Sequence, residues 1–287
     1  MTVLALKNIK KHFVTATDWR GRPQHVVRAV DDVSLQIAHK ESLGLVGESG
    51  CGKTTLARIA MKLIAPDTGE IILGGKNISL LSQTQMRPLR RKIQMVFQDP
   101  FNSLDPRFTI RRILNEAMLL SSLSTAEKEG RFRELLLAVG LSPDILHRFP
   151  YEFSGGERQR IAIARALAAD PQLVILDEAV SSLDVLVQEQ VLNMLLDLQQ
   201  RFGVTYFFIS HNLNVIKKLC PQIAVMYQGR IVEQAYRESL LNQPQHPYTK
   251  NLLSAAMSYR CDRDFVFDWA SSKMRWTQKT KGHFVLE

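Results

Sequence analysis

The alternation of apolar and polar residues divides the chain into a strand-rich opening and a later stretch in which strands and helices alternate. The opening third contains three short apolar or alternating runs separated by polar turns, which is the pattern of β-strands. These runs are VLALKNI, VRAVDDVSLQI and SLGLVG. A helix is expected to begin after Gly52, and GEIILGG and KIQMVFQ predict two further strands. The first part of the chain is therefore predicted to be mostly β-structure.

Apolar residues take up helical spacing after residue 99, where Ile110 to Leu120 and Glu127 to Val139 predict two helices. From Ser154 onward helices alternate with buried strands, and this order predicts a parallel sheet. No internal repeat is evident, so the simplest interpretation is one domain with a helical insertion between residues 99 and 161. The later predicted elements are a helix at Arg158 to Ala168, a strand at Leu173 to Leu176, a helix at Val187 to Gln200 and a strand at Val204 to Ile209, followed by another helix. The tail from Ser258 shows no clear period, and its structure is left open.

Composition favours a globular protein of a reducing compartment. The 287 residues are 45% hydrophobic, enough for a sizeable core in one large or two modest domains. No charged start precedes a long apolar run, and no 18 consecutive apolar residues occur, so the sequence signals neither secretion nor membrane spanning. Cys51, Cys220 and Cys261 form neither a CxxC pair nor a zinc spacing. We therefore expect a cytoplasmic protein without a disulfide framework.

The segment GESGCGKT, residues 47–54, matches the phosphate-binding pattern GxxxxGK[ST] and stands where a predicted strand meets a predicted helix. Its glycines let the backbone fold around phosphates with N–H groups pointing inward, and the helix presents its positive end to the same anion. Lys53 is expected to neutralise the β- and γ-phosphates, the Thr54 hydroxyl to ligate Mg²⁺, and Thr55 to contact the α-phosphate region. The candidate nucleotide-binding residues are Gly47, Glu48, Ser49, Gly50, Cys51, Gly52, Lys53, Thr54 and Thr55.

The segment LVILDE, residues 173–178, is an apolar strand that ends in two carboxylates, the second half of a P-loop ATPase site. Successive strand residues point to opposite faces. Asp177 is therefore expected to orient hydrated Mg²⁺, while Glu178 faces elsewhere and polarises the attacking water as a general base.

The helix predicted near residue 158 carries the motif that points to a family. FSGGERQRIAIARAL, residues 153–167, resembles the LSGGQ signature of ABC ATPases. Ser154, Gly155 and Gly156 stand at the start of the helix, so a hydroxyl, bare backbone N–H groups and the helix dipole can all address a γ-phosphate. Further segments resemble family elements in the right order: Gln98 as the Q-loop residue that contacts Mg²⁺ and water, SSLD at residues 181–184 as the D-loop, and His211 as the switch histidine at the γ-phosphate. Phe13 resembles the aromatic residue that stacks on adenine, and a core phenylalanine is the alternative.

This resemblance covers residues 1 to about 257 and implies an α/β fold. It implies a P-loop NTPase (RecA-like) core with an N-terminal antiparallel β subdomain and an inserted α-helical subdomain. Residues 1–98 and 162–242 are expected to form the nucleotide-binding core, residues 99–161 the helical subdomain with the signature, and residues 243–287 a C-terminal helix and tail.

The same resemblance implies ATP and Mg²⁺ as cofactors and a composite site, in which the phosphate loop of one subunit meets the signature of another in a head-to-tail dimer. The implied partners are two transmembrane permease subunits, a second ATPase subunit that is either a paralogue or a second copy, and indirectly an extracytoplasmic solute-binding protein. Nucleic acid is not among them. The implied location is peripheral, at the cytoplasmic face of the inner membrane.

Three segments resemble the dipeptide, oligopeptide and nickel importer branch, notably its second ATPase component: GESGCGKTTLARIAMKLI, VFQDPFNSLDPR and QPQHPYTKNLLSA. The resemblance implies ATP-driven import of di- or oligopeptides. Ala179 and Val180 replace the common Pro and Thr after the catalytic Glu, a variant also present in nickel-type members, so import of nickel or a metal chelate stays open.

Other departures from the family pattern leave the phosphate-contacting groups in place. Glu157 stands where the signature usually has Gln, Phe153 where it has Leu, and Asn212 where Asp usually follows the switch histidine. Some members of the branch carry four cysteines near the C-terminus, but here only Cys261 lies there, and we expect no iron–sulfur centre.

Other function classes fit the sequence less well. The net charge of +9 is compatible with nucleic acid, anionic lipid or a nucleotide, and equally with a solvated face. An ABC-type DNA-repair or chromosome ATPase needs a long coiled-coil arm, for which the roughly 55 residues between Gln98 and Ser154 are too few. A translation factor of this type has two cassettes in one chain. A cassette that binds ATP without hydrolysing it is disfavoured because Glu178, His211 and Ser154 are present.

Overall fold

The computed structural model describes residues 1–17, 23–97, 103–258, 265, 267, 269 and 275–286. Gln98, the expected Q-loop glutamine, and Cys261 lie outside the described residues. The chain forms two compact units, one of Met1–Leu80 with Phe208–Glu287 and the other of Leu81–Phe207. Strand β8 (Thr205–Ser210) carries the chain from the second unit into the first.

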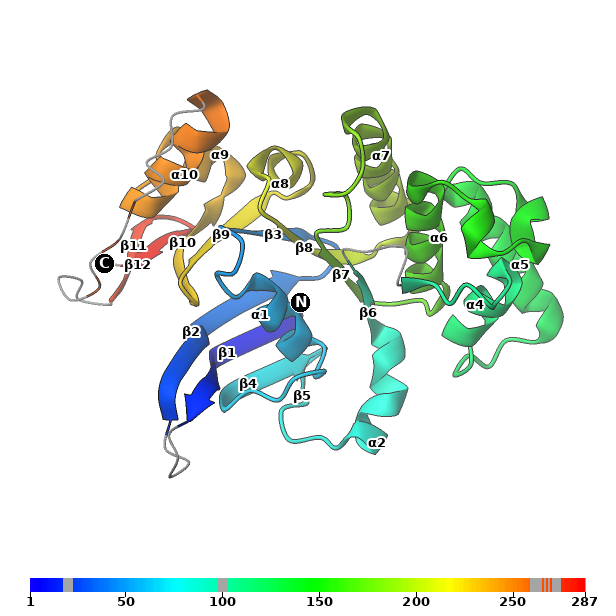
Figure 1. Ribbon diagram of the computed structural model, residues 1–287, viewed down its shortest axis with the longest axis horizontal. Helices are drawn as coiled ribbons and strands as arrows, with labels where there is room; N and C mark the ends of the chain where they lie inside the picture. The colour runs from blue at the N-terminus through cyan, green and yellow to red at the C-terminus, as the bar shows by residue number, and fades with distance from the viewer. Residues whose placement is uncertain are drawn as a thin grey trace. The chain divides into compact units, whose positions relative to one another are not determined.

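The first unit contains a four-stranded antiparallel sheet in the order β2-β1-β4-β5 (Figure 1). In β1 a run of four apolar residues, Val3 to Leu6, is buried together with Ile9, whereas Lys7 and Asn8 are exposed. The β-rich opening predicted from the sequence is confirmed. The strands are β1 (Thr2–Thr17), β2 (Pro23–Ala38), β4 (Thr68–Leu73) and β5 (Lys76–Asn77).

The second sheet of this unit mixes parallel and antiparallel pairing. Strand β3 (Ser42–Val46) runs parallel to β9 (Gln222–Tyr227), and β9 pairs antiparallel with β10 (Arg230–Tyr236). A C-terminal hairpin, β11 (Trp276–Thr280) and β12 (His283–Leu286), extends this sheet from β10 (Figure 1). The helices of the unit are α1 (Lys53–Ala60), α8 (Leu213–Leu219), α9 (Arg237–Asn242) and α10 (Pro247–Ser258).

The second unit is mostly helical. Strand β6 (Ile93–Val96) runs parallel to β7 (Leu173–Asp177), which confirms the predicted parallel pairing. Helix α6 packs against α4, α5 and α7, so the expected helical insertion lies within this unit (Figure 1). Its helices are α2 (Gln83–Met86), α4 (Ile110–Ala117), α5 (Thr125–Ala138), α6 (Gly155–Ala168) and α7 (Val185–Phe202), with 3-10 turns at Arg87–Lys92, Pro143–His147 and Pro150–Glu152.

The predicted helices and strands of residues 110–210 are confirmed with small shifts at their ends. The largest shifts are in α4, which ends at Ala117 and not at the predicted Leu120, and in α6, which begins at Gly155 and not at the predicted Arg158. The C-terminal hairpin β11–β12 was not predicted. Within the described ranges no helix is both long enough and apolar enough to cross a membrane.

Candidate nucleotide site

The loop between β3 and α1 has a backbone course that requires glycine. Gly52 has a φ of +111°, and a Cβ added there would lie 2.0 Å from the carbonyl oxygen of Ala29. A Cβ on Gly47 would lie 2.2 Å from the carbonyl oxygen of Met226. Since no side chain fits at either position, the loop is held in a tight curl between its neighbours and leads directly into the N-terminus of α1. This is the arrangement that phosphate binding requires.

Lys53 is the first residue of α1, and its side chain is only 5% exposed. Its ammonium group donates hydrogen bonds to the carbonyls of Gly47, at 2.8 Å, and Glu48, at 2.7 Å. The positive charge therefore lies inside the curl of the loop. Thr54 and Thr55 follow in the first turn of α1 and are half-buried.

The Cys51 thiol lies in the same loop, 3.8 Å from the Lys53 ammonium group. Burial raises the pKa of this thiol, and the nearby positive charge of Lys53 only partly opposes that rise. Cys51 is therefore a neutral thiol at physiological pH.

Two other predicted contacts with nucleotide belong to the first unit. Phe13 on β1 pairs across the sheet with Val27 on β2, and its side chain is 37% exposed, so it is not a core phenylalanine. The Lys11 ammonium group lies 5.5 Å from the centre of its ring. His211 is exposed directly after β8, one residue before Asn212, which caps helix α8. The assignments of Phe13 to adenine and of His211 to the γ-phosphate stay predictions.

The two predicted acidic residues of the site lie in the second unit. Asp177 is the last residue of β7 and is buried. Glu178 has a φ of 50°, outside the strand region, and its carbonyl accepts hydrogen bonds from the backbone N–H and hydroxyl of Ser181. Because β7 ends at Asp177, Glu178 lies outside the strand on whose alternation the sequence argument relied. A positive φ at a non-glycine residue is costly, and such strain is typical of functional positions.

The signature segment begins helix α6, with Ser154 as its N-cap. The Ser154 hydroxyl accepts the Glu157 backbone N–H at 3.3 Å, and the Ser154 backbone N–H donates to a Glu157 carboxylate oxygen at 2.9 Å, which closes a capping box. The Ser154 hydroxyl also donates to that carboxylate oxygen at 2.8 Å. The backbone N–H and the hydroxyl of Ser154 together lower the pKa of Glu157. The sequence analysis assigned Ser154 to phosphate binding and did not identify its hydrogen bonds with the Glu157 carboxylate.

A pocket of about 460 Å³ opens at the signature segment. Ser154, Gly155 and Gly156 line it, and so do Ser182 and Asp184 of the predicted D-loop. A Cβ on Gly156 would lie 2.7 Å from a methyl carbon of Val187 on α7, so glycine lets the start of α6 approach α7 closely. The second unit thus brings the signature and the D-loop together at one surface.

The sequence argument missed a set of buried polar residues in the C-terminal part of the first unit. Glu233 in β10 is 0% exposed, and its carboxylate contacts His283 Nε2 at 2.6 Å. The Tyr248 hydroxyl accepts the backbone N–H of Glu48 in the phosphate loop at 3.1 Å. A charged residue inside the apolar strand RIVEQAY and the string HPYT were the available signals, and neither reveals a contact between distant segments.

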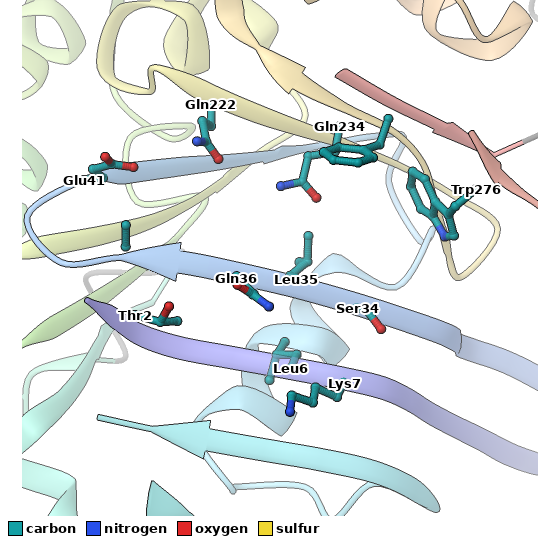
Figure 2. A pocket seen from close by; sticks show the side chains of 12 residues that line it. Thr2, Leu6, Lys7, Ser34, Leu35, Gln36, Glu41, Gln222, Gln234 and Trp276 are labelled. Atoms are coloured by element: carbon teal, nitrogen blue, oxygen red, sulfur yellow. The ribbon is translucent and has the colours of Figure 1, made fainter. Parts of the chain in front are cut away.

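A separate pocket of about 560 Å³ lies between the antiparallel sheet and the C-terminal hairpin. Figure 2 shows Gln234 and Trp276 on one side of it and Ser34, Leu35 and Leu6 on the other. None of its lining residues belongs to the phosphate loop.

Comparison with known proteins gives consistent matches. The family model described as ABC transporter matches residues 30–181. A probable peptide ABC transporter ATP-binding protein of Sinorhizobium fredii is 48% identical over 255 residues, which cover 88% of this chain and 72% of the relative. The oligopeptide transport ATP-binding protein OppF of Bacillus subtilis is 46% identical over 256 residues, which cover 88% of this chain and 82% of that protein.

Solved structures agree on the fold. The dimeric ATP-binding cassette MJ0796 in a post-hydrolysis state bound to ADP and Pi is 27% identical, with a TM-score of 0.71 over 82% of this chain and 98% of that chain. CbiO1 from Clostridium perfringens, part of the transporter complex cbiONQ, has a TM-score of 0.73 over 90% of this chain and 96% of that chain. At 22% identity, this second match bears on the fold alone.

Proposed function

Because the chain belongs to the ABC transporter family, we propose that it is the ATP-hydrolysing subunit that powers import of di- or oligopeptides through a membrane transporter. The observation that carries the ATPase assignment is the glycine-dependent loop with the Lys53 ammonium group inside its curl. The peptide assignment is supported by two relatives, 46% and 48% identical over most of this chain, whose names specify peptide or oligopeptide transport.

Different residues of the chain have different roles in ATP binding and hydrolysis. The loop from Gly47 to Thr55 surrounds the phosphates with backbone N–H groups, and Lys53 neutralises the β- and γ-phosphates. Glu178 accepts a proton from the attacking water, and His211 holds the γ-phosphate. Phe13, an exposed aromatic ring, stacks on the adenine.

A magnesium ion fits the oxygen donors that the chain offers. The Thr54 hydroxyl would ligate it directly, Asp177 through water, and Gln98 would contact the ion and the attacking water. When bound, such an ion would supply positive charge that offsets the negative charge of the phosphates. Hard oxygen ligands of this kind, together with retained water, are what Mg²⁺ prefers.

The signature of one subunit completes the site of another in this proposal. The pocket at Ser154, Gly155 and Gly156 presents the N-terminus of α6, where an anion is favoured. The γ-phosphate bound to the loop of one subunit meets this N-terminus on its mate, so ATP joins the two and hydrolysis releases them. The mate is a second copy or a paralogue.

The remaining partners are proposed from the resemblance to importers. Two permease subunits carry the solute through the membrane, with an extracytoplasmic binding protein supplying it. The chain then acts peripherally at the cytoplasmic face of the inner membrane. The second candidate cargo is nickel or a metal chelate, because Ala179 and Val180 follow the catalytic Glu.

The direct test is ATP-dependent association of a variant that binds but does not hydrolyse. Glu178→Gln keeps the shape of the side chain but removes the base, so we expect ATP hydrolysis to fall roughly a hundredfold or more. The same variant should dimerise with ATP, as measured by light scattering after size exclusion. Lys53→Ala, which lacks the phosphate-binding charge, is the matched control and should remain monomeric with ATP.

Two results would count against the proposal. A Glu178→Gln protein that dimerises no better with ATP than without it contradicts the composite site. Uptake of labelled nickel, but not of labelled peptides, in cells that carry the complete transporter contradicts the peptide assignment and supports the second candidate.

A further inference from the structure

Tyr248 connects the C-terminal part of the chain to the phosphate loop. It lies in the first turn of α10, and its side chain is 0% exposed. Its hydroxyl oxygen accepts the backbone N–H of Glu48 at 3.1 Å. Burial raises the pKa of the Tyr248 hydroxyl, so this group stays neutral at physiological pH. Glu48 is the second residue of the loop, and its N–H is thus fixed from the side of α10.

The position of Tyr248 is itself fixed by a buried hydrogen-bond network. The Tyr248 backbone N–H donates to His246 Nδ1 at 3.1 Å, and the His246 backbone N–H donates to Glu233 at 3.0 Å. Glu233 also accepts the Gln245 backbone N–H, at 2.9 Å, and contacts His283 Nε2 of the hairpin. These bonds hold the start of α10, strand β10 and the hairpin as one body behind the loop.

Aromatic side chains of the tail pack on the same body. The Tyr248 ring centre lies 4.3 Å from that of Tyr227 and 6.0 Å from that of Phe265. The Trp269 ring lies 6.1 Å from Tyr227, and its indole N–H donates to Gln228 at 2.7 Å. Rings at these separations contribute beyond the area that they bury.

Trp269 also lines a pocket beside the phosphate loop. A pocket of about 460 Å³ is lined by Trp269 together with Gly50 and Cys51 of the loop. Arg28 and Arg230 line the same pocket, and the Arg230 guanidinium lies 5.1 Å from the Trp269 ring. Tyr248 therefore contacts the loop at Glu48, and Trp269 shares a pocket with Gly50 and Cys51.

We propose that Tyr248 is a positioning residue for the phosphate loop, and that packing of Phe265 and Trp269 on Tyr248 and Tyr227 and binding of nucleotide strengthen each other. The coupling is reciprocal: if this aromatic packing favours the binding-competent loop, then bound nucleotide must favour the packing. This inference rests on the proposed function only in that the loop binds ATP. The inference gives Tyr248, the tyrosine of HPYT, a physical role at the phosphate loop. Packing of helix α10 alone would not give it that role.

The first test is Tyr248→Phe, which removes the hydroxyl and keeps the ring. The Glu48 N–H then loses its partner, so we expect the KM for ATP to rise about three- to tenfold with kcat within about twofold of wild type. Tyr206→Phe is the matched control, because the Tyr206 hydroxyl is equally buried and donates to the Leu195 carbonyl, away from the loop. It should leave the KM unchanged.

The second test follows the fluorescence emission of Trp269. Trp19, Trp269 and Trp276 are the three tryptophans of the chain, so changing Trp19 and Trp276 to Phe leaves Trp269 as the sole emitter. Adding Mg-ATP should shift its emission, and Tyr248→Phe in this background should raise the ATP concentration at half-change about three- to tenfold, in line with the KM. Trp269→Leu should weaken ATP binding in the otherwise wild-type protein, which keeps the inference testable if Tyr248→Phe folds poorly.

The inference is overturned if Tyr248→Phe and Tyr206→Phe have the same KM, or if Trp269 emission is indifferent to saturating ATP. A wild-type protein that binds no ATP by equilibrium dialysis contradicts the proposed function instead. The two failures are therefore separable.

Discussion

At the scale of single residues, Glu157 is the departure from the family pattern with the clearest physical consequence. Its carboxylate accepts the Ser154 hydroxyl where the γ-phosphate of a mate is proposed to bind. The hydrogen bonds from Ser154 lower the pKa of Glu157, so the group is charged at neutral pH. A fixed negative charge beside the proposed phosphate position opposes binding.

Glu157→Gln removes that charge and keeps an acceptor for the capping box. In the Glu178→Gln background we expect the ATP concentration at half-maximal dimerisation to fall about two- to fivefold, and this decrease should shrink at high salt. Light scattering against ATP concentration measures it. The matched control is Glu127→Gln on α5, where the Ser124 hydroxyl donates to Glu127 at 2.6 Å in the same box geometry away from the signature. Equal shifts in both variants would mean that helix capping, and not the charge, is responsible.

At the scale of elements, local sequence patterns predicted the helices, strands and loops whose structure depends on residues close by in the chain. The strand–loop–helix at residues 42–60 and the alternating elements of residues 155–210 follow from apolar spacing, glycine positions and caps such as Ser154 and Asp184. The identity of the phosphate loop required no three-dimensional information, because its chemistry lies within eight consecutive residues.

The C-terminal elements depend on partners far away in the chain, and their sequence carried no such signal. Strand β11, WTQKT, is polar and mostly exposed, so no apolar alternation marks it. The hairpin is placed by His283, which meets Glu233 fifty residues earlier. Tyr248 meets Glu48 two hundred residues earlier. Pairings of this kind cannot be obtained from local spacing.

His246, which directly precedes α10, makes the free energy of unfolding depend on pH. Burial lowers the pKa of His246 to about 4, and the Glu233 carboxylate only partly opposes that shift. The unfolded chain takes up a proton near pH 6.5, whereas the folded chain resists doing so until about pH 4. The stabilisation is therefore complete above the unfolded pKa and is lost as the pH falls towards the folded one.

We expect this histidine to remove about 2 kcal/mol from the free energy of unfolding between pH 7.5 and pH 5, as measured by urea denaturation. His246→Asn keeps an acceptor for the Tyr248 N–H but does not titrate, so the difference between variant and wild type should shrink by this amount as the pH falls. Glu233 and His283 are unchanged in both proteins, so the difference between the two curves reports on residue 246 alone. Parallel pH curves for the two proteins would contradict the assignment.

At the scale of the whole molecule, the proposed chemistry is divided between the two units of the chain. The phosphate loop and His211 belong to the first unit, whereas Glu178, the signature and the D-loop belong to the second. The start of α6, where the γ-phosphate is proposed to bind, lies in the unit that does not contain the phosphate loop. A head-to-tail pair of subunits accounts for a division of this kind, because each subunit then supplies its signature to the phosphate loop of the other.

Mixing two inactive variants tests that exchange directly. Lys53→Ala destroys the phosphate loop and leaves the signature, whereas Ser154→Arg blocks the signature and leaves the loop. Alone, each variant forms only defective composite sites and should hydrolyse almost no ATP. In a mixed dimer, the loop of the Ser154→Arg subunit faces the signature of the Lys53→Ala subunit, so one site is intact. Random pairing of equal amounts should restore roughly a quarter of the wild-type rate per subunit. Recovery should vanish when Lys53→Ala and Ser154→Arg are placed in the same chain and mixed with either single variant. If the two single variants together stay as inactive as each alone, while wild type hydrolyses ATP without another subunit, then the loop and signature of different copies do not share a triphosphate.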